Sequence, residues 1–190
     1  MEINLLRHGR PDIDRKERIT AAEFHPWMER YDRSRVADRP PQEVISRSLQ
    51  CHHIVCSDLS RSLHSADLLG VEADLVEPLF REAELPSFVF GGPRVAAGNF
   101  SMLARVTWLC GHSRDCESYR AARCRAEEGA DRLIELALSY RQVLLVGHGM
   151  MNWLIGRVLK KQHWRSLRSA RANTYWGLSS YYHVAPDSAH

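Results

Sequence analysis

Arginine and histidine residues that could bind and transfer an anionic group stand at three separate places in the sequence. These places are Arg7-His8-Gly9, Arg61 in the stretch that starts at Ser57, and Gly147-His148-Gly149. An imidazole can act as a nucleophile or as an acid and base, and a guanidinium binds anionic oxygens through paired hydrogen bonds. Glycine lets the backbone approach a ligand closely. Brought together by a fold, these residues would form a cationic pocket whose natural ligand is a phosphoryl group.

A strand is predicted directly before each of the three places. Ile3–Leu6 and His53–Ser57 are short apolar runs, and Gln142–Val146 is the continuous kind that is buried on both faces of a parallel sheet. In an open parallel sheet, the carboxyl ends of the strands line the crevice where ligands bind. We therefore expect the three places to meet at one edge of the sheet, where helix N-termini after Gly149 and near Ser60 also favour an anion.

Helical patterns separate these strands, at residues 41–50, 59–69, 101–109, 116–140 and 150–159. A late run rich in Tyr and Ser, Leu178–Val184, is predicted as a further strand at an edge of the sheet. Strands that alternate with helices indicate an α/β fold, here a three-layer α/β/α sandwich with a mainly parallel sheet. The length of 190 residues fits a single domain, 1–190, in which the Pro- and Gly-interrupted stretch at about 86–114 is expected to form a lid.

Four fragments of the sequence resemble the motifs of the histidine phosphatase superfamily, the phosphoglycerate mutase-like family of branch one. The fragments are Leu6-Arg7-His8-Gly9, Ser57-Asp58-Leu59-Ser60-Arg61-Ser62 with Ser65-Ala66, Arg81-Glu82, and Gly147-His148-Gly149. Each fragment alone is a weak signal. Their order, their spacing and their places at strand ends match the family from about residue 5 to residue 154.

The resemblance implies a phosphoric monoester hydrolase that acts on a phosphorylated small molecule through a phosphohistidine. His8 would attack phosphorus, and Glu82 would protonate the leaving group and then deprotonate the attacking water. Glu84, two residues on, is the alternative acid. The phosphoryl oxygens would be bound by Arg7, Arg61 and His148, with Gly149 and Arg10 as further contacts. This chemistry requires no metal and no cofactor, since the cationic side chains take the role that magnesium has elsewhere.

Two stretches depart from the family pattern. Arg10-Pro11-Asp12-Ile13 stands where most members have a small hydroxyl residue and later an Asn, and Ala83–Phe88 replaces the Gly and Trp-Glu-Gly element that follows the acid in the mutases. These departures weaken the mutase interpretation and leave the substrate open. Two alternatives remain: a phosphoglycerate mutase-like phosphotransferase, and a non-catalytic phosphate-binding or regulatory module that acts on a phosphoprotein partner.

The charge balance gives no indication of nucleic acid. The chain has 26 basic and 23 acidic residues, and of the basic ones only Lys16, Lys160 and Lys161 are lysine. Arg165, Arg168 and Arg171 lie at helical spacing, which we interpret as a solvated face of a helix over Trp164–Arg171. No apolar run is long enough for a membrane span, and the start, Met1-Glu2-Ile3-Asn4, lacks the basic stretch of a signal peptide. We therefore expect a cytoplasmic protein with no membrane and no nucleic-acid partner.

The five cysteines are an odd number without a C-x-x-C pair, so free thiols are expected. Cys110, His112, Cys116 and Cys124 offer soft zinc ligands, but their spacing fits no recognised zinc motif, and Cys116 and Cys124 are expected on one helix. We expect no metal at these residues.

Overall fold

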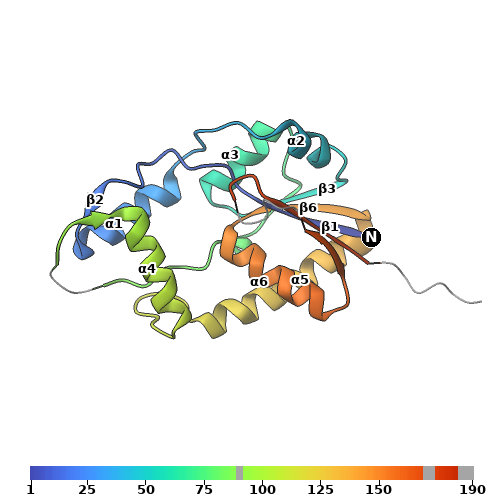
Figure 1. Cartoon of the computed structure of the whole chain (residues 1–190). Helices are drawn as coiled ribbons and strands as arrows, with labels where there is room; N and C mark the ends of the chain where they lie inside the picture. The colour runs from blue at the N-terminus through green and yellow to red at the C-terminus, as the bar shows by residue number, and fades with distance from the viewer. Residues whose placement is uncertain (89–91, 169–173, 184–190) are drawn as a thin grey trace, which may run out of the picture.

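A six-stranded sheet forms the centre of the protein, with the strand order β4-β3-β6-β1-β8-β7 (Figure 1). The computed structural model describes residues 1–88, 92–168 and 174–183. The strands are β1 (Glu2–Arg7), β3 (His53–Cys56), β4 (Leu75–Val76), β6 (Gln142–Gly147), β7 (Arg165–Arg168) and β8 (Leu178–Tyr182). The first four strands are parallel to one another, and β8 pairs antiparallel with β1 and with β7. The predicted α/β fold with a mainly parallel sheet is therefore confirmed.

Both faces of the sheet are covered because its strands alternate between two apolar clusters. In β6, Val143 and Leu145 pack on one side with α5 (Tyr119–Tyr140) and α6 (Gly149–Lys161). Leu144 and Val146 point to the opposite side, where α2 (Gln42–Ser48) and α3 (Ser60–Leu69) lie. Successive side chains of a strand face opposite ways, so a continuous apolar run requires helices on both faces.

A smaller layer stands beyond the sheet and has its own apolar cluster. It consists of α1 (Ala21–Arg33), α4 (Ala97–Leu109) and a two-stranded sheet of β2 (Arg18–Ile19) and β5 (Val95–Ala96). Phe24 and Trp27 of α1 pack there against Phe100 and Ala104 of α4. Figure 1 shows α1 and α4 side by side, apart from the helices that cover the sheet. The segment expected to form a lid, 86–114, thus supplies α4 and β5, while α1 is an additional element of the same layer.

Helix α1 begins with a capping box. The Thr20 hydroxyl accepts from the Glu23 backbone N–H at 3.4 Å, and the Glu23 carboxylate accepts from the Thr20 N–H at 2.8 Å. These reciprocal bonds satisfy two N–H groups that the first turn of a helix leaves without partners.

Three details of the predicted elements were wrong. Strand β8 does not lie at an edge, because β7 pairs with its outer side. Residues Arg165–Arg168 form that strand and not a helix, and Arg171 lies outside the described residues. Cys116 precedes α5, whereas Cys124 lies within it. The strand β7 follows from pairing with β8, a contact between distant segments that a local helical spacing does not reveal.

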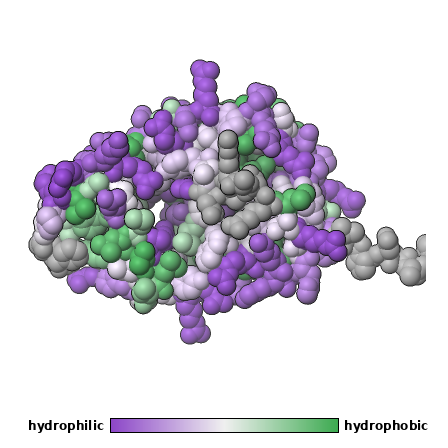
Figure 2. Space-filling model, viewed as in Figure 1, coloured by the Kyte–Doolittle hydropathy of each residue, from purple (hydrophilic) through white to green (hydrophobic). Residues whose placement is uncertain are grey.

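Helix α4 carries an apolar stripe on its outer face. Met102, Leu103, Val106 and Leu109 are each at least 44% exposed. Figure 2 shows hydrophobic surface over this helix and a hollow between its layer and the sheet. In the described part of the chain, no helix combines the length and the apolar character needed to cross a bilayer.

Candidate active site

The ends of three parallel strands bring the chemistry-bearing residues together, as the sequence predicts. Arg7 pairs in register with Gly147, and Cys56 pairs with Val146, so β1, β3 and β6 end at the same edge of the sheet. His8 and His148 are the first residues after β1 and β6, and their ring centroids are 5.1 Å apart.

His8 is buried, with 2% of its surface exposed, and both of its ring nitrogens have a neighbour. Nδ1 lies 2.7 Å from the Gly9 carbonyl oxygen, which can only accept, so Nδ1 carries the proton and donates. Nε2 accepts from Nε–H of Arg61 at 3.2 Å. Burial and then the charge of Arg61 lower the pKa of His8 well below the usual imidazole value, against an opposing effect of the Gly9 carbonyl. His8 is therefore a neutral imidazole with its lone pair on Nε2.

Arg61 is buried, with only 1% of the residue exposed. Three neighbouring side chains hold its guanidinium in place. Its Nε faces His8, and its Nη1 donates to Oδ1 of Asp32 at 2.8 Å. The ring of Tyr31 covers one face, with Cζ at 4.8 Å from the ring centroid. Burial raises the pKa of the Tyr31 hydroxyl to about 12, so this ring stays neutral. Both Tyr31 and Asp32 come from α1, which the sequence analysis did not anticipate.

His148 is fully buried, and neither ring nitrogen has a hydrogen-bond partner among the described residues. Burial, Arg61 and His8 lower its pKa well below the usual value. An unsatisfied buried imidazole costs free energy unless a ligand supplies a partner. His148 can thus form a hydrogen bond with a group that binds beside His8.

Arg7 and Tyr175, which lies in the turn before β8, form the remaining side of the site. The Arg7 guanidinium stacks on the ring of Tyr175, 4.5 Å from its centroid, and the Tyr175 ring also lies 5.8 Å from that of His8. The Tyr175 hydroxyl accepts from Nη1 of Arg15 at 3.0 Å. Gly149 lies directly over Arg7, since a Cβ on Gly149 would be 3.3 Å from Arg7 Nε. Tyr175 belongs to none of the sequence fragments that predict the site.

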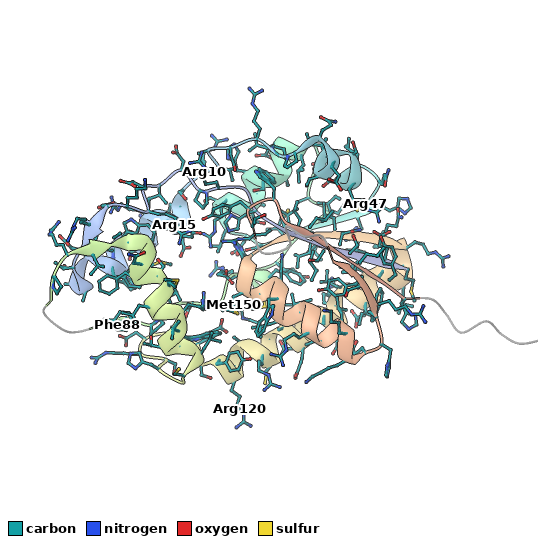
Figure 3. All side chains as sticks on the ribbon, in the orientation of Figure 1. Arg10, Arg15, Arg47, Phe88, Arg120 and Met150 are labelled. Atoms are coloured by element: carbon teal, nitrogen blue, oxygen red, sulfur yellow. The ribbon has the colours of Figure 1, made fainter. Side chains whose placement is uncertain are left out.

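Glu82 sits at the N-terminus of α6. Its carboxylate accepts from the Met150 N–H at 3.1 and 3.2 Å, from the Met151 N–H at 3.1 Å and from its own neighbour, the Ala83 N–H, at 3.0 Å. Figure 3 shows Met150 at the start of α6, facing the space toward α4. The unpaired N–H groups of a first helical turn attract an anion, which explains why the carboxylate is held there.

The other predicted residues lie as follows. Glu84 lines the same cavity as Glu82 and accepts from the Glu117 N–H at 3.2 Å. Arg81 makes a two-bond ion pair with Asp58, at 2.8 and 2.5 Å. Arg10 is exposed, its backbone N–H bonds to Asp38, and it is not part of the cavity wall.

A cavity of about 690 Å³ opens beside the arginines at the strand ends and Glu82. Arg7, Arg61 and Glu82 line its inner end. Its outer walls come from α1, through Met28 and Tyr31, and from α4, through Met102 and Arg105. The volume far exceeds that of a phosphoryl group, so the cavity has room for a sizeable organic group as well.

The residues that the sequence offers as zinc ligands do not form a metal site in the described part of the chain. Within residues 1–88, 92–168 and 174–183, no three His, Cys, Asp or Glu side chains come together as a metal site, and Cys110, His112, Cys116 and Cys124 are among those residues. All five cysteines have free thiols.

Solved structures with the same fold support the topology. Mycobacterial hydrolase 1 superposes with a TM-score of 0.61 at 18% identity, over 98% of this chain and 92% of that chain. A mycobacterial glucosyl-3-phosphoglycerate phosphatase gives 0.58 at 18% identity, over 94% and 88%. A putative α-ribazole-5′-phosphate phosphatase from Escherichia coli gives 0.56 at 20% identity, over 84% and 80%. A search of curated protein sequences found no significant match.

The family is shown by the sequence itself. Residues 3–186 match the model of the histidine phosphatase superfamily (branch 1), which is nearly the whole chain. The matched range includes the site residues Arg7, His8, Arg61, Glu82 and His148. Two of the similar structures carry the name of a phosphatase. This chain therefore belongs to branch 1 of the histidine phosphatase superfamily.

Proposed function

We propose that this protein is a phosphomonoesterase that hydrolyses a phosphorylated small molecule through a phosphohistidine at His8. The observation that carries the proposal is the state of His8: the Gly9 carbonyl holds the proton on Nδ1, and burial with Arg61 keeps the ring neutral. A neutral imidazole whose unprotonated nitrogen faces a guanidinium is a nucleophile beside a binding group for anionic oxygen.

Arg7, Arg61 and His148 are the groups proposed to bind the three phosphoryl oxygens. Charge on these oxygens must be stabilised during transfer, and fixed hydrogen-bond donors in a buried site do this effectively; Arg7 and Arg61 add positive charge, and His148 is a neutral donor. When a phosphoryl group enters, Nε–H of Arg61 turns from the lone pair of His8 to an oxygen, which frees Nε2 for attack. His148 gains the hydrogen bond that it lacks among the described residues. No step of this scheme draws on a metal or a cofactor.

Glu82 is proposed as the acid and base. The Nε2 lone pair forms the bond to phosphorus while the bond to the leaving oxygen breaks, and that oxygen takes the proton of the Glu82 carboxyl group. A water molecule then attacks phosphorus, its proton returns to Glu82, and the bond between phosphorus and Nε2 breaks to release inorganic phosphate. Glu84 lines the same cavity and remains the alternative acid.

The leaving group is proposed to lie in the cavity between α1 and α4. The walls there are mixed, with Met28, Leu85 and Met102 as apolar parts and Arg15 as a charged one. Such a cavity suits a phosphorylated metabolite with a sizeable organic group better than it suits a minimal one.

The test is to trap phosphate on His8. Purified protein is mixed with 4-nitrophenyl phosphate, quenched in alkali, which preserves phosphohistidine, and mapped by mass spectrometry. We expect label on the His8 peptide, and His8→Ala should lose the label and lower turnover by about 10³-fold or more. The matched control is His25→Ala, since His25 is exposed on α1 and should leave both unchanged.

The outcomes distinguish the alternatives. Undiminished turnover in His8→Ala would overturn the mechanism. Phosphate binding without label or turnover on a panel of phosphate esters would favour the binding module, and transfer of phosphate to an added hydroxyl compound in preference to water would favour the phosphotransferase.

A further inference from the structure

The segment that carries the proposed acid has no regular structure of its own. Residues 81–88 form neither helix nor strand, and they replace the element that follows the acid in relatives with a Trp-Glu-Gly sequence. A loop of this kind needs other groups to hold its carbonyls. We call residues 79–84 the acid segment; it begins within the short 3-10 helix Pro78–Phe80 and has no regular structure from residue 81 on.

Two arginines from different helices bind the carbonyl oxygens of the acid segment. Arg125 of α5 donates from Nη1 to the carbonyls of Leu79 and Arg81, each at 2.8 Å. Its other side is paired with Glu117, through Nε at 3.1 Å and a closer bond from Nη2. Both side chains of that pair are about four-fifths buried, so Arg125 is an anchored support for the first half of the segment.

Arg105 of α4 holds the second half. Its Nη2 donates to the Ala83 carbonyl at 2.6 Å and its Nη1 to the Glu84 carbonyl at 3.4 Å. The guanidinium stacks on Trp108 of the same helix, 4.8 Å from the ring centroid. In contrast to Arg125, Arg105 makes no ion pair with a carboxylate in the described part of the chain. Its donors are directed to the backbone of the acid segment.

A single residue, Ala83, connects Arg105 to Glu82 through its two backbone polar groups. The Ala83 N–H donates to Oε1 of Glu82 at 3.0 Å, while the Ala83 carbonyl accepts from Arg105. The Glu82 charge also acts on the buried guanidinium, since it opposes the burial that lowers the pKa of Arg105. Glu82 is thereby held between the N-terminus of α6 and a side chain of α4.

We propose that Arg105 is a positioning residue that sets the place of the Glu82 carboxyl group relative to the leaving oxygen. The inference rests on the proposed function. It gives α4 a second role, because the same helix that walls the leaving-group cavity also fixes the acid.

The test compares leaving groups. In Arg105→Met, kcat/KM for 4-nitrophenyl phosphate should fall less than about 3-fold, because this leaving group departs without a proton. For benzyl phosphate, whose alkoxide needs the acid, kcat/KM should fall by about 30-fold or more, mainly in kcat. Arg105→Lys, which keeps the charge and one donor for the Ala83 carbonyl, should recover part of this loss. The matched control is Arg120→Met, since Arg120 is exposed on α5 and points away from the site (Figure 3).

A double-mutant comparison separates positioning from a general loss of structure. In a Glu82→Gln background, Arg105→Met should add less than about 3-fold to the loss with benzyl phosphate, because both changes remove the same acid. Equal losses for all leaving groups in both Arg105 variants, or a full additional loss in Glu82→Gln, would overturn the inference.

Two further outcomes are distinguishable. A raised KM confined to substrates with a second anionic group would show that Arg105 binds substrate and would also overturn the positioning role. Phosphate trapping on wild-type His8 tests the proposed function separately, and an absent label would contradict that function. If the label is present but Arg105→Met has the same leaving-group dependence as the wild type, only the role of Arg105 is refuted.

Discussion

The two buried imidazoles predict that the protein loses stability on mild acidification. His8 and His148 are 2% and 0% exposed, and burial together with Arg61 lowers the pKa of both well below the usual value. In the unfolded chain they titrate near the ordinary imidazole pKa of about 6.5. Between that value and the lower folded pKa, the unfolded state binds more protons than the folded state, so stability rises with pH and is lost as pH falls.

The size of the effect follows from proton linkage. For a group that stays neutral in the folded protein, lowering the pH from 7 to 5.5 costs about 1.2 kcal/mol, so the two imidazoles together cost about 2.5 kcal/mol. This figure is an upper limit, reached when neither ring takes up a proton before unfolding. It is a large part of the total stability of a domain of this size.

The measurement is urea unfolding at pH 7 and pH 5.5, in buffers without phosphate, for the wild type and for a variant with His8→Asn and His148→Asn. We expect the wild type to lose about 2 kcal/mol more than the variant between the two pH values, since all other groups titrate alike in both proteins. If the two proteins lose the same amount, the imidazoles are not held neutral by the fold, and the argument for His8 as a ready nucleophile loses its basis.

Two other substitutions test contacts at the site and in the core. Asp32→Ala should lower stability by about 1–2 kcal/mol in phosphate-free buffer, because it leaves the buried Arg61 charge without its ion-pair partner, and saturating inorganic phosphate should restore more stability to the variant than to the wild type. Equal stabilisation by phosphate in denaturant titrations would contradict this. Gly156→Ala should destabilise by about 1–3 kcal/mol, because its Cβ would lie 2.1 Å from the hydroxyl of the buried Tyr181. Thermal unfolding checks it against Gly129→Ala, whose nearest contact is 3.3 Å, and a smaller loss in Gly156→Ala would be the contrary result.

The sequence alone was sufficient to predict the central parallel strands and the site residues that follow them. Apolar runs mark β1, β3 and β6 because strands buried on both faces admit few polar side chains, and Arg7, His8 and His148 follow such runs directly. The helix α1 was missed, although Thr20 and Glu23 have the spacing of a capping box. That signal is local and was available.

Other parts of the site leave no local trace in the sequence. Asp32 meets Arg61 across 29 positions of the chain, and Arg15 meets Tyr175 across 160. Arg105 binds carbonyl oxygens, which every residue type supplies, so no sequence pattern marks its partners. These contacts join segments that are far apart in the chain, so they depend on tertiary packing that no local pattern encodes.

The position of β1 in the sheet has a consequence for synthesis of the protein. This strand pairs with β6 on one side and with β8 on the other, and these two strands begin at Gln142 and Leu178. A ribosome therefore produces the apolar strand long before either neighbour exists, and the nascent chain must keep it from aggregating meanwhile. A chain that stops before residue 142 has neither partner strand for β1. His8 is made early, but it can meet His148 only after β6 has been made.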